Sequence, residues 1–174
     1  MVTKAYIGLG SNVGDRIKWH QRAVAALAAH SEVQVVAQSR YYESPALLPD
    51  NAPAEWNSSF INQVIAIETT LNPLDLLAAC QQAEASLGRQ KTGRWGPREI
   101  DIDILVYGDE WVNENGLSIP HAEMTKRDFV LLPLRDVAPD WVYPAGGNHG
   151  GQRIDALCAA LSSITATPVD SHDA

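Results

Sequence analysis

The 174-residue sequence has few cysteines and no hydrophobic run long enough to cross a membrane. Its two cysteines, Cys80 and Cys158, lie far apart in apolar, helix-like patterns, which favours reduced, packed thiols and excludes a disulfide scaffold. The longest apolar stretches have strand length, far below the ~18–20 residues of a membrane span. No charged start followed by an apolar segment precedes the first element. We therefore expect a cytoplasmic protein with no membrane partner.

Positive charge is also scarce, with 13 lysines and arginines against 21 acidic residues and a formal net charge of −8. Such a surface repels polyanions, so no nucleic-acid partner is expected. The glycine fingerprints of phosphate sites are missing as well. Gly8, Gly10 and Gly14 have the wrong spacing for dinucleotide binding, and no Gly-x-x-x-x-Gly-Lys-Ser/Thr run occurs. These glycines are interpreted as a tight turn after the first strand.

The residues that are present, 45% of them hydrophobic, suffice for one domain with a sizeable core. The element order is predicted to be β-α-β-β-α-β, the α+β ferredoxin-like arrangement of an antiparallel sheet with both helices on one face. C-terminal additions include a short helix. The predicted strands cover 3–9, 33–42, 60–69 and 99–107, and the predicted helices cover 15–30, 72–88, 127–137 and 154–164. The domain is expected to span residues 1–164, and residues 165–174 are expected to form a frayed tail.

Two acids, Asp101 and Asp103, alternate with isoleucines in the run from Ile100 to Val106. Residues two apart in a strand share a face, so both acids point one way while the isoleucines point into the core. Neighbouring acids on a central strand repel each other and lose hydration, which favours a compensating cation. Their oxygens suit Mg²⁺, which completes its coordination with water and substrate phosphate. An exposed sheet face with solvated acids explains this short motif equally well.

Basic residues gather just before this strand although the chain is acidic overall. Four lie between Arg89 and Arg98 with no acid before Glu99, and Lys126 and Arg127 form a second pair. Guanidinium groups bind phosphate oxygens in a bidentate manner, so arginines beside a metal site indicate polyphosphate binding. The alternative is a solvated loop whose arginines pair with surface acids.

The two phenylalanines, Phe60 and Phe129, each lie two positions from a polar side chain, Asn62 and Arg127 respectively. Stacking combined with an amide donor and acceptor suits a planar nitrogen heterocycle. Taken singly, each phenylalanine is explained as ordinary core.

One long motif carries a family resemblance. The run from Gly88 to Leu105, Gly-Arg-x-x-x-x-Arg-Trp-Gly-Pro-Arg-x-x-Asp-x-Asp-Ile-Leu, resembles the signature of the 6-hydroxymethyl-7,8-dihydropterin pyrophosphokinase family. Shorter segments resemble the same family, namely Ala5 to Asn12, Ser44-Pro45, Phe60 to Asn62 and Ile119 to His121. The likeness extends from the first strand to about Pro144.

The resemblance implies a monomeric enzyme of folate biosynthesis that transfers the pyrophosphoryl group of ATP to the hydroxymethyl oxygen of the dihydropterin and releases AMP. It implies that Asp101 and Asp103 hold two Mg²⁺ ions and that Arg89 and Arg98 close over the phosphates as catalytic residues. The residues that match the family's ATP site are Gln81, Glu84, Lys91, Trp95, Ile104, Ser118, His121 and Arg127. Those that match its pterin site are Ser44, Pro45, Leu47, Phe60, Asn62 and Phe129.

Two other classes of protein share parts of this pattern. A ferredoxin-like RNA-binding module has the same element order, but residues 59–64 lack its basic and aromatic platform, and the net charge has the wrong sign. A two-metal nuclease or nucleotidyl transferase shares the acids without needing the paired phenylalanines. Release of AMP, in place of pyrophosphate, separates the pyrophosphokinase from this last class.

Overall fold

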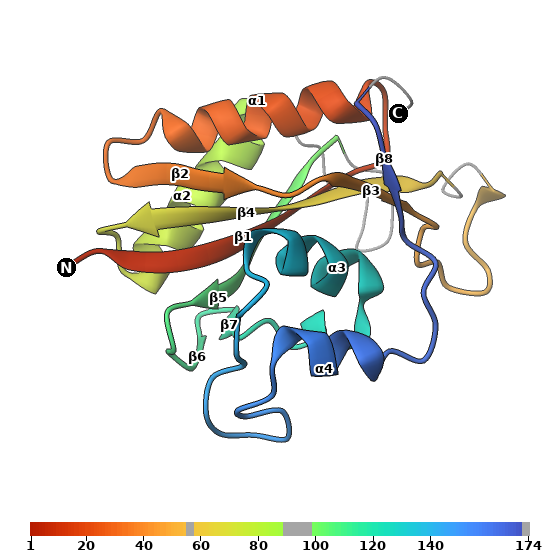
Figure 1. The fold of residues 1–174 in the computed structure, drawn as a ribbon. Coiled ribbons are helices and arrows are strands. Elements are labelled where there is room, and N and C mark those ends of the chain that lie inside the picture. The colour runs from red at the N-terminus through yellow and green to blue at the C-terminus, as the bar shows by residue number, and fades with distance from the viewer. Residues whose placement is uncertain (55–57, 89–98, 172–174) are drawn as a thin grey trace.

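The computed structural model describes residues 1–54, 58–88 and 99–171. Within them, an antiparallel sheet of six strands lies between two layers of helices (Figure 1). A separate two-stranded hairpin, β6–β7, follows β5 in the chain. In chain order the elements are β1 (Thr3–Ser11), α1 (Arg16–Ala28), β2 (Val33–Gln38), β3 (Tyr41–Ser44), β4 (Phe60–Thr69), α2 (Pro73–Ser86), β5 (Asp101–Tyr107), β6 (Val112–Glu114), β7 (Leu117–Ile119), the 3-10 helix η2 (Met124–Lys126), α3 (Asp128–Val137), α4 (Ile154–Ala159) and β8 (Thr167–Val169).

The sheet has the strand order β5-β1-β4-β3-β8, and β2 also pairs with β4. The stretch 33–42, predicted as one strand, therefore forms two strands that pair with successive parts of β4. The break falls at Ser39, whose hydroxyl oxygen accepts the backbone N–H of Val64 at 3.0 Å. β5 lies at the end of the strand order, so the expectation that the two acids stand on a central strand is wrong.

Helices α1 and α2 are capped by Asp15 and Asn72, the first residues of the predicted helical ranges 15–30 and 72–88. The Asp15 carboxylate accepts the Lys18 backbone N–H at 3.1 Å. The side-chain oxygen of Asn72 accepts the Asp75 N–H at 2.8 Å, and Pro73 occupies the first turn of α2. These contacts satisfy N–H groups that a helix leaves without an internal partner, and they fix where each helix starts.

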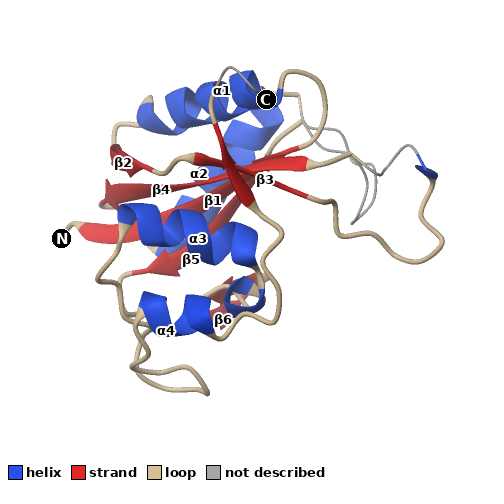
Figure 2. Ribbon diagram, turned by 45° about the vertical axis from the view of Figure 1, so that its right-hand side comes forward, coloured by secondary structure: helices blue, strands red, loops and turns tan. Residues whose placement is uncertain are grey.

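One face of the sheet packs on α1 and α2 through a continuous apolar core (Figure 2). Alternate residues of β1 and β5 point into it, as their sequence pattern predicts. Complete burial of a large aliphatic side chain stabilises a fold by roughly 1.5–3 kcal/mol. The largest fully buried members of this core are Ile7, Leu27, Ile65, Ile67, Leu76, Ile100 and Ile119.

The opposite face is covered by α3 and α4, which pack over a second core that includes Val64, Leu105 and Leu131. The predicted helix over 127–137 is present and continues through Pro133. The last helix is shorter than predicted and ends at Ala159.

The C-terminal segment differs most from expectation. Residues 167–169, placed in a frayed tail by the sequence, form strand β8 and pair with β3 in antiparallel register. The segment is ordered by tertiary contacts, since Ala166 is buried in the second core. No helix of the described residues is long and apolar enough to cross a membrane.

Candidate active site

A cavity of about 440 Å³ opens on the α3 face of the sheet, where the strands β1, β4 and β5 lie side by side. It brings together residues that were predicted for the pterin site and residues that were predicted for the metal and ATP sites. From the proposed pterin group it is lined by Ser44, Pro45, Leu47, Phe60, Asn62 and Phe129. From the proposed metal and ATP groups it is lined by Asp101, Asp103, His121 and Arg127.

The floor of the cavity is formed by two glycines of β1. Gly10 pairs with Asn62 on one side and Asp101 on the other, and Gly8 pairs with Asp103. A Cβ atom at Gly10 would stand 3.5 Å from the Asn62 side-chain oxygen. Because glycine has no side chain, a space remains between β4, which carries Asn62, and β5, which carries Asp101 and Asp103. The expectation that the turn begins at Gly10 is wrong, since Gly10 lies inside β1, whereas Gly8 lies in the strand predicted over 3–9.

The two acids stand on the cavity side of β5, as the alternation predicts. Asp101 is half-buried and Asp103 is exposed, whereas Ile102 and Ile104 are buried in the core on the other side. Two carboxylates on one face are hard oxygen donors of the kind that Mg²⁺ prefers. Among the described residues, no group of three His, Cys, Asp or Glu side chains could hold an ion unaided. The donor set thus fits a magnesium ion whose coordination is completed by water and phosphate.

Asn62 presents its amide to the opposite end of the cavity. Its Nδ2 donates to the Ser44 hydroxyl at 2.7 Å and to the Tyr42 carbonyl at 3.3 Å. Both Asn62 and Ser44 are buried, so these bonds hold the amide in one orientation. With Nδ2 occupied, Oδ1 lies over Gly10 at the cavity floor. It is therefore placed to accept an N–H group from a ligand.

The aromatic walls come from two separate elements. Phe60 is the first residue of β4, and Phe129 lies in the first turn of α3. Both rings are half-buried and line the cavity. The Arg127 guanidinium carbon lies 5.6 Å from the centroid of the Phe129 ring, a cation–π contact that places a positive charge beside this wall.

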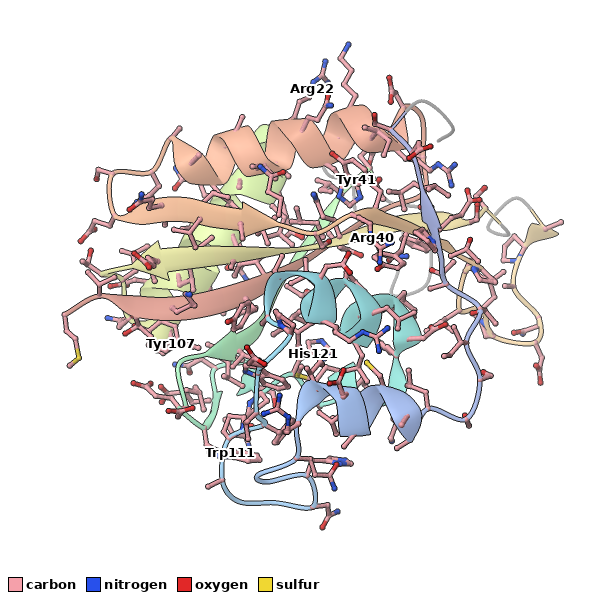
Figure 3. The ribbon with its side chains drawn as sticks, viewed as in Figure 1. Arg22, Arg40, Tyr41, Tyr107, Trp111 and His121 are labelled. Carbon is pink, nitrogen blue, oxygen red and sulfur yellow. The ribbon has the colours of Figure 1, made fainter. Side chains whose placement is uncertain are left out.

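His121, labelled in Figure 3, lines the same cavity as Asp101 and Asp103. Its backbone N–H donates to the Leu105 carbonyl at 2.8 Å, which fixes it beside β5. Its Nδ1 accepts the Glu123 backbone N–H at 3.2 Å, so the proton of the neutral ring is on Nε2. Burial lowers the pKa of His121, and the negative charge of Asp103 partly opposes that shift. A neutral ring of this kind is an Nε2–H donor at neutral pH.

Four predicted ATP-site residues lie outside this cavity. Gln81 and Ser118 are exposed on α2 and β7, and Ile104 is buried in the first core. Glu84 is buried, and its Oε2 accepts the Ile102 N–H at 2.9 Å, a contact that holds α2 against β5. Their binding roles stay predictions. The predicted residues Arg89, Lys91, Trp95 and Arg98 lie outside the described residues.

The sequence reading missed several residues that line the cavity. The glycines of β1 were the detectable signal, since glycine inside a strand marks a close approach to the backbone. The others carried no local signal because only the strand register and the position of α3 bring them to the cavity. The missed lining residues are Gly8, Leu9, Gly10, Gln63, Val64, Leu105, Ala122, Glu123 and Val130.

Comparison with known proteins assigns this arrangement to a class. Residues 6–139 match the family described as 7,8-dihydro-6-hydroxymethylpterin-pyrophosphokinase. The chain belongs to this pyrophosphokinase family.

Two relatives are named 2-amino-4-hydroxy-6-hydroxymethyldihydropteridine pyrophosphokinase. The protein of Methylorubrum extorquens is 44% identical over 160 residues, which cover 92% of this chain and 94% of the relative. The protein of Pseudomonas aeruginosa is 41% identical over 146 residues, 84% of this chain and 87% of the relative. The match thus includes nearly the whole length of both proteins.

A solved structure shares the fold. The crystal structure of Plasmodium falciparum HPPK-DHPS, wild type, with pteroate aligns with a TM-score of 0.68 at 16% identity. The alignment covers 91% of this chain and 42% of that longer chain. The family motif and this likeness agree on a mixed α/β fold with an antiparallel sheet.

Proposed function

We propose that this protein transfers the pyrophosphoryl group of ATP to the hydroxymethyl oxygen of 6-hydroxymethyl-7,8-dihydropterin, releasing AMP, in folate biosynthesis. Family membership and the names of its relatives support this function. The observation that carries it is the cavity. An amide and two aromatic rings suited to a pterin share a single space with two carboxylates suited to a metal-bound triphosphate.

The aromatic end of the cavity binds and orients the pterin in this proposal. Phe60 and Phe129 flank the planar ring, and Oδ1 of Asn62 accepts one of its N–H groups. A ring held at this end has its substituent directed along the β1 floor toward β5. The fixed Asn62–Ser44–Tyr42 contacts provide the rigid geometry that an in-line transfer requires.

The acidic end binds the triphosphate. We propose that Asp101 and Asp103 would hold two Mg²⁺ ions. When bound, these ions would neutralise the negative charge of the phosphates. The neutral His121 donates its Nε2–H to a phosphate oxygen, and Arg127 adds positive charge between the two ends. The hydroxymethyl oxygen forms a bond to the β-phosphorus and loses its proton to water, while the bond between the β-phosphorus and the oxygen that leaves with AMP breaks. Positioning and charge neutralisation carry most of such a reaction, so no covalent intermediate on the protein is needed.

Product analysis tests the proposal. The protein is mixed with ATP, Mg²⁺ and 6-hydroxymethyl-7,8-dihydropterin, and nucleotides and pterins are separated by chromatography. We expect one AMP for each pyrophosphorylated pterin and no AMP without the pterin. Formation of ADP, or of free pyrophosphate in place of the pterin product, would contradict it. Binding of single-stranded RNA would instead favour the RNA-binding alternative.

Several finer features accompany this proposal. The order of β5, β1, β4 and the β2/β3 pair, with α1 and α2 on one face, supports a ferredoxin-like topology. We also propose a single-domain monomer in the cytoplasm that acts on small molecules and has no nucleic-acid or membrane partner. The net charge of −8 supports the absence of a nucleic-acid partner. Arg89 and Arg98 remain the proposed phosphate-facing arginines by resemblance.

A further inference from the structure

Two sides of the cavity belong to elements that lie far apart in the sequence. Ser44 ends β3, whereas Phe129 lies in the first turn of α3. Outside the cavity lining, these elements are joined by Arg40, which is labelled in Figure 3 and whose guanidinium donates from two nitrogens to the Asp136 carboxylate at 3.1 Å. That contact holds the C-terminal end of α3. The N-terminal end, which carries Phe129, needs a restraint of its own.

Asp128, the first residue of α3, provides that restraint. Its Oδ1 accepts the Phe129 backbone N–H at 2.9 Å. Its Oδ2 accepts the backbone N–H groups of Thr165 at 2.5 Å and Ala166 at 2.8 Å. One carboxylate therefore connects the residue that forms the aromatic wall to a segment that begins 37 residues after Asp128.

The charge and burial of Asp128 show that this contact is specific. The residue is only 7% exposed. No Lys, Arg or His among the described residues forms a salt bridge with it. Its negative charge is stabilised by backbone N–H groups and by the N-terminus of α3. The helix has no side-chain cap from Arg127, so Asp128 is its local acceptor.

The segment bound by Asp128 continues to β3, the strand that carries Ser44. Ala166 is buried in the second core, and the next three residues form β8. Thr167 pairs with Glu43, and Pro168 pairs with Tyr42. Both partners belong to β3, the strand that ends at Ser44. Figure 1 shows this blue segment leaving α4 and rising past α3 to β8. We define residues 165–169 as the C-terminal strap, since they contact both β3, which ends at Ser44, and α3, which carries Phe129.

We propose that Asp128 is a positioning residue that, through the C-terminal strap, sets the place of Phe129 relative to Ser44 and Asn62 and so determines affinity for the pterin. The inference rests on the proposed function of the cavity. Asp128 does not line the cavity and does not contact the reacting atoms. Its loss therefore affects binding of the pterin, and the acidic end on β5 keeps its geometry.

The first test is Asp128→Asn. An amide must direct its NH₂ group at one of the backbone N–H donors, so at least one contact is lost at nearly constant volume. We expect KM for 6-hydroxymethyl-7,8-dihydropterin to rise roughly tenfold, while kcat and KM for ATP change by less than about twofold. Asp155→Asn is the matched control, because Asp155 is an exposed acid in the first turn of α4. A drop in kcat with an unchanged pterin KM would overturn the proposal.

A second variant approaches the contact from the strap. Thr165→Pro removes both the backbone N–H and the hydroxyl that donate to Asp128, without altering Asp128 or any cavity residue. It should raise the pterin KM like Asp128→Asn, and the double variant should be no worse than either single one, because both changes break the same contact. Additive effects would contradict action through the strap. A chain ending at Val169 keeps the strap and should behave as the full chain does.

Amide hydrogen exchange gives a readout independent of activity. In folded Asp128→Asn, exchange should accelerate at Phe129 or at Thr165 and Ala166, depending on which donors face the new NH₂ group, while Leu76 in the first core stays protected. Unchanged exchange at these three amides would overturn the inference. If the wild-type protein makes no pyrophosphorylated pterin, the proposed function fails, yet the exchange result still decides whether Asp128 joins α3 to the strap.

Discussion

The two faces of the sheet are formed by the same strands, but one face packs into the core with α1 and α2 and the other lines the cavity. Toward α1 and α2, β1 contributes Ala5, Ile7 and Leu9, all buried in a continuous core. Toward α3, the same strand contributes Gly8 and Gly10, and the neighbouring strand contributes Asp101 and Asp103. Alternation thus gives one strand an apolar face that stabilises the fold and an open face that forms a site. Substitutions on the two faces should therefore separate stability from activity.

The largest expected effect is on the open face. Asp103→Ala should lower kcat/KM by roughly 10³-fold or more, because a carboxylate that faces the triphosphate is lost. The melting temperature should stay near that of the wild type, since Asp103 is exposed. Asp109→Ala, an exposed acid just after β5, is the control and should keep full activity. Near-normal AMP formation by Asp103→Ala would remove this residue from the reaction.

The converse effect is expected on the apolar face. Ile65→Ala removes a fully buried side chain from the first core and should lower the free energy of unfolding by about 3–4 kcal/mol. Urea denaturation measures this loss, and Val36→Ala at an exposed position serves as control. The activity of the folded fraction at low temperature should be unchanged. A fall in kcat that exceeds the unfolded fraction would show that the two faces are coupled.

Filling the floor of the cavity tests the role of its glycines. Gly10→Val should weaken pterin binding about 100-fold, because the new methyl groups stand beside Asn62 and Phe60. Gly10→Ala should have a smaller effect, since its Cβ meets these atoms at 3.5 and 3.6 Å, ordinary contact distances. Titration of the pterin, followed by its fluorescence, measures both. Equal affinity for all three proteins would mean that the ring binds elsewhere.

The smallest effect concerns His20, a buried histidine of α1. Burial lowers the pKa of His20 to about 4, from 6.5 in the unfolded chain. The unfolded state therefore binds the extra proton between these values, so stability falls as the pH drops through this range. Between pH 6 and 4.5 the loss should approach about 2 kcal/mol.

Urea denaturation at the two pH values measures the contribution of His20. His20→Gln should flatten the dependence, whereas His30→Gln, a histidine replaced near the end of the same helix, should retain it. An equally steep loss of stability in His20→Gln would assign the acid sensitivity to other groups.

Local patterns predicted the apolar face and the acids well. The alternation of Ile100 to Ile104 fixes which side of β5 is buried, and Asn72 with Pro73 fixes the start of α2. Phe60, Asn62 and Phe129 were identified by their residue types and by resemblance, and the structure gathers them in one cavity.

Long-range pairing was beyond local patterns. Nothing near Gly10 in the sequence reveals that it lies between Asn62 and Asp101, because that depends on the register of three strands. The exposed, polar stretch around Thr167 has no strand pattern, and it is ordered by the Asp128 contacts and by pairing with β3. Such order arises from partners distant in the chain.

A crystal structure with Mg²⁺, a nonhydrolysable ATP analogue and 6-hydroxymethylpterin tests the central claim most directly. The account predicts the pterin ring between Phe60 and Phe129 with an N–H directed at Asn62, and the phosphates at Asp101 and Asp103 with the metal between them. A pterin bound away from the β1 floor, or phosphates bound away from these two carboxylates, would contradict it.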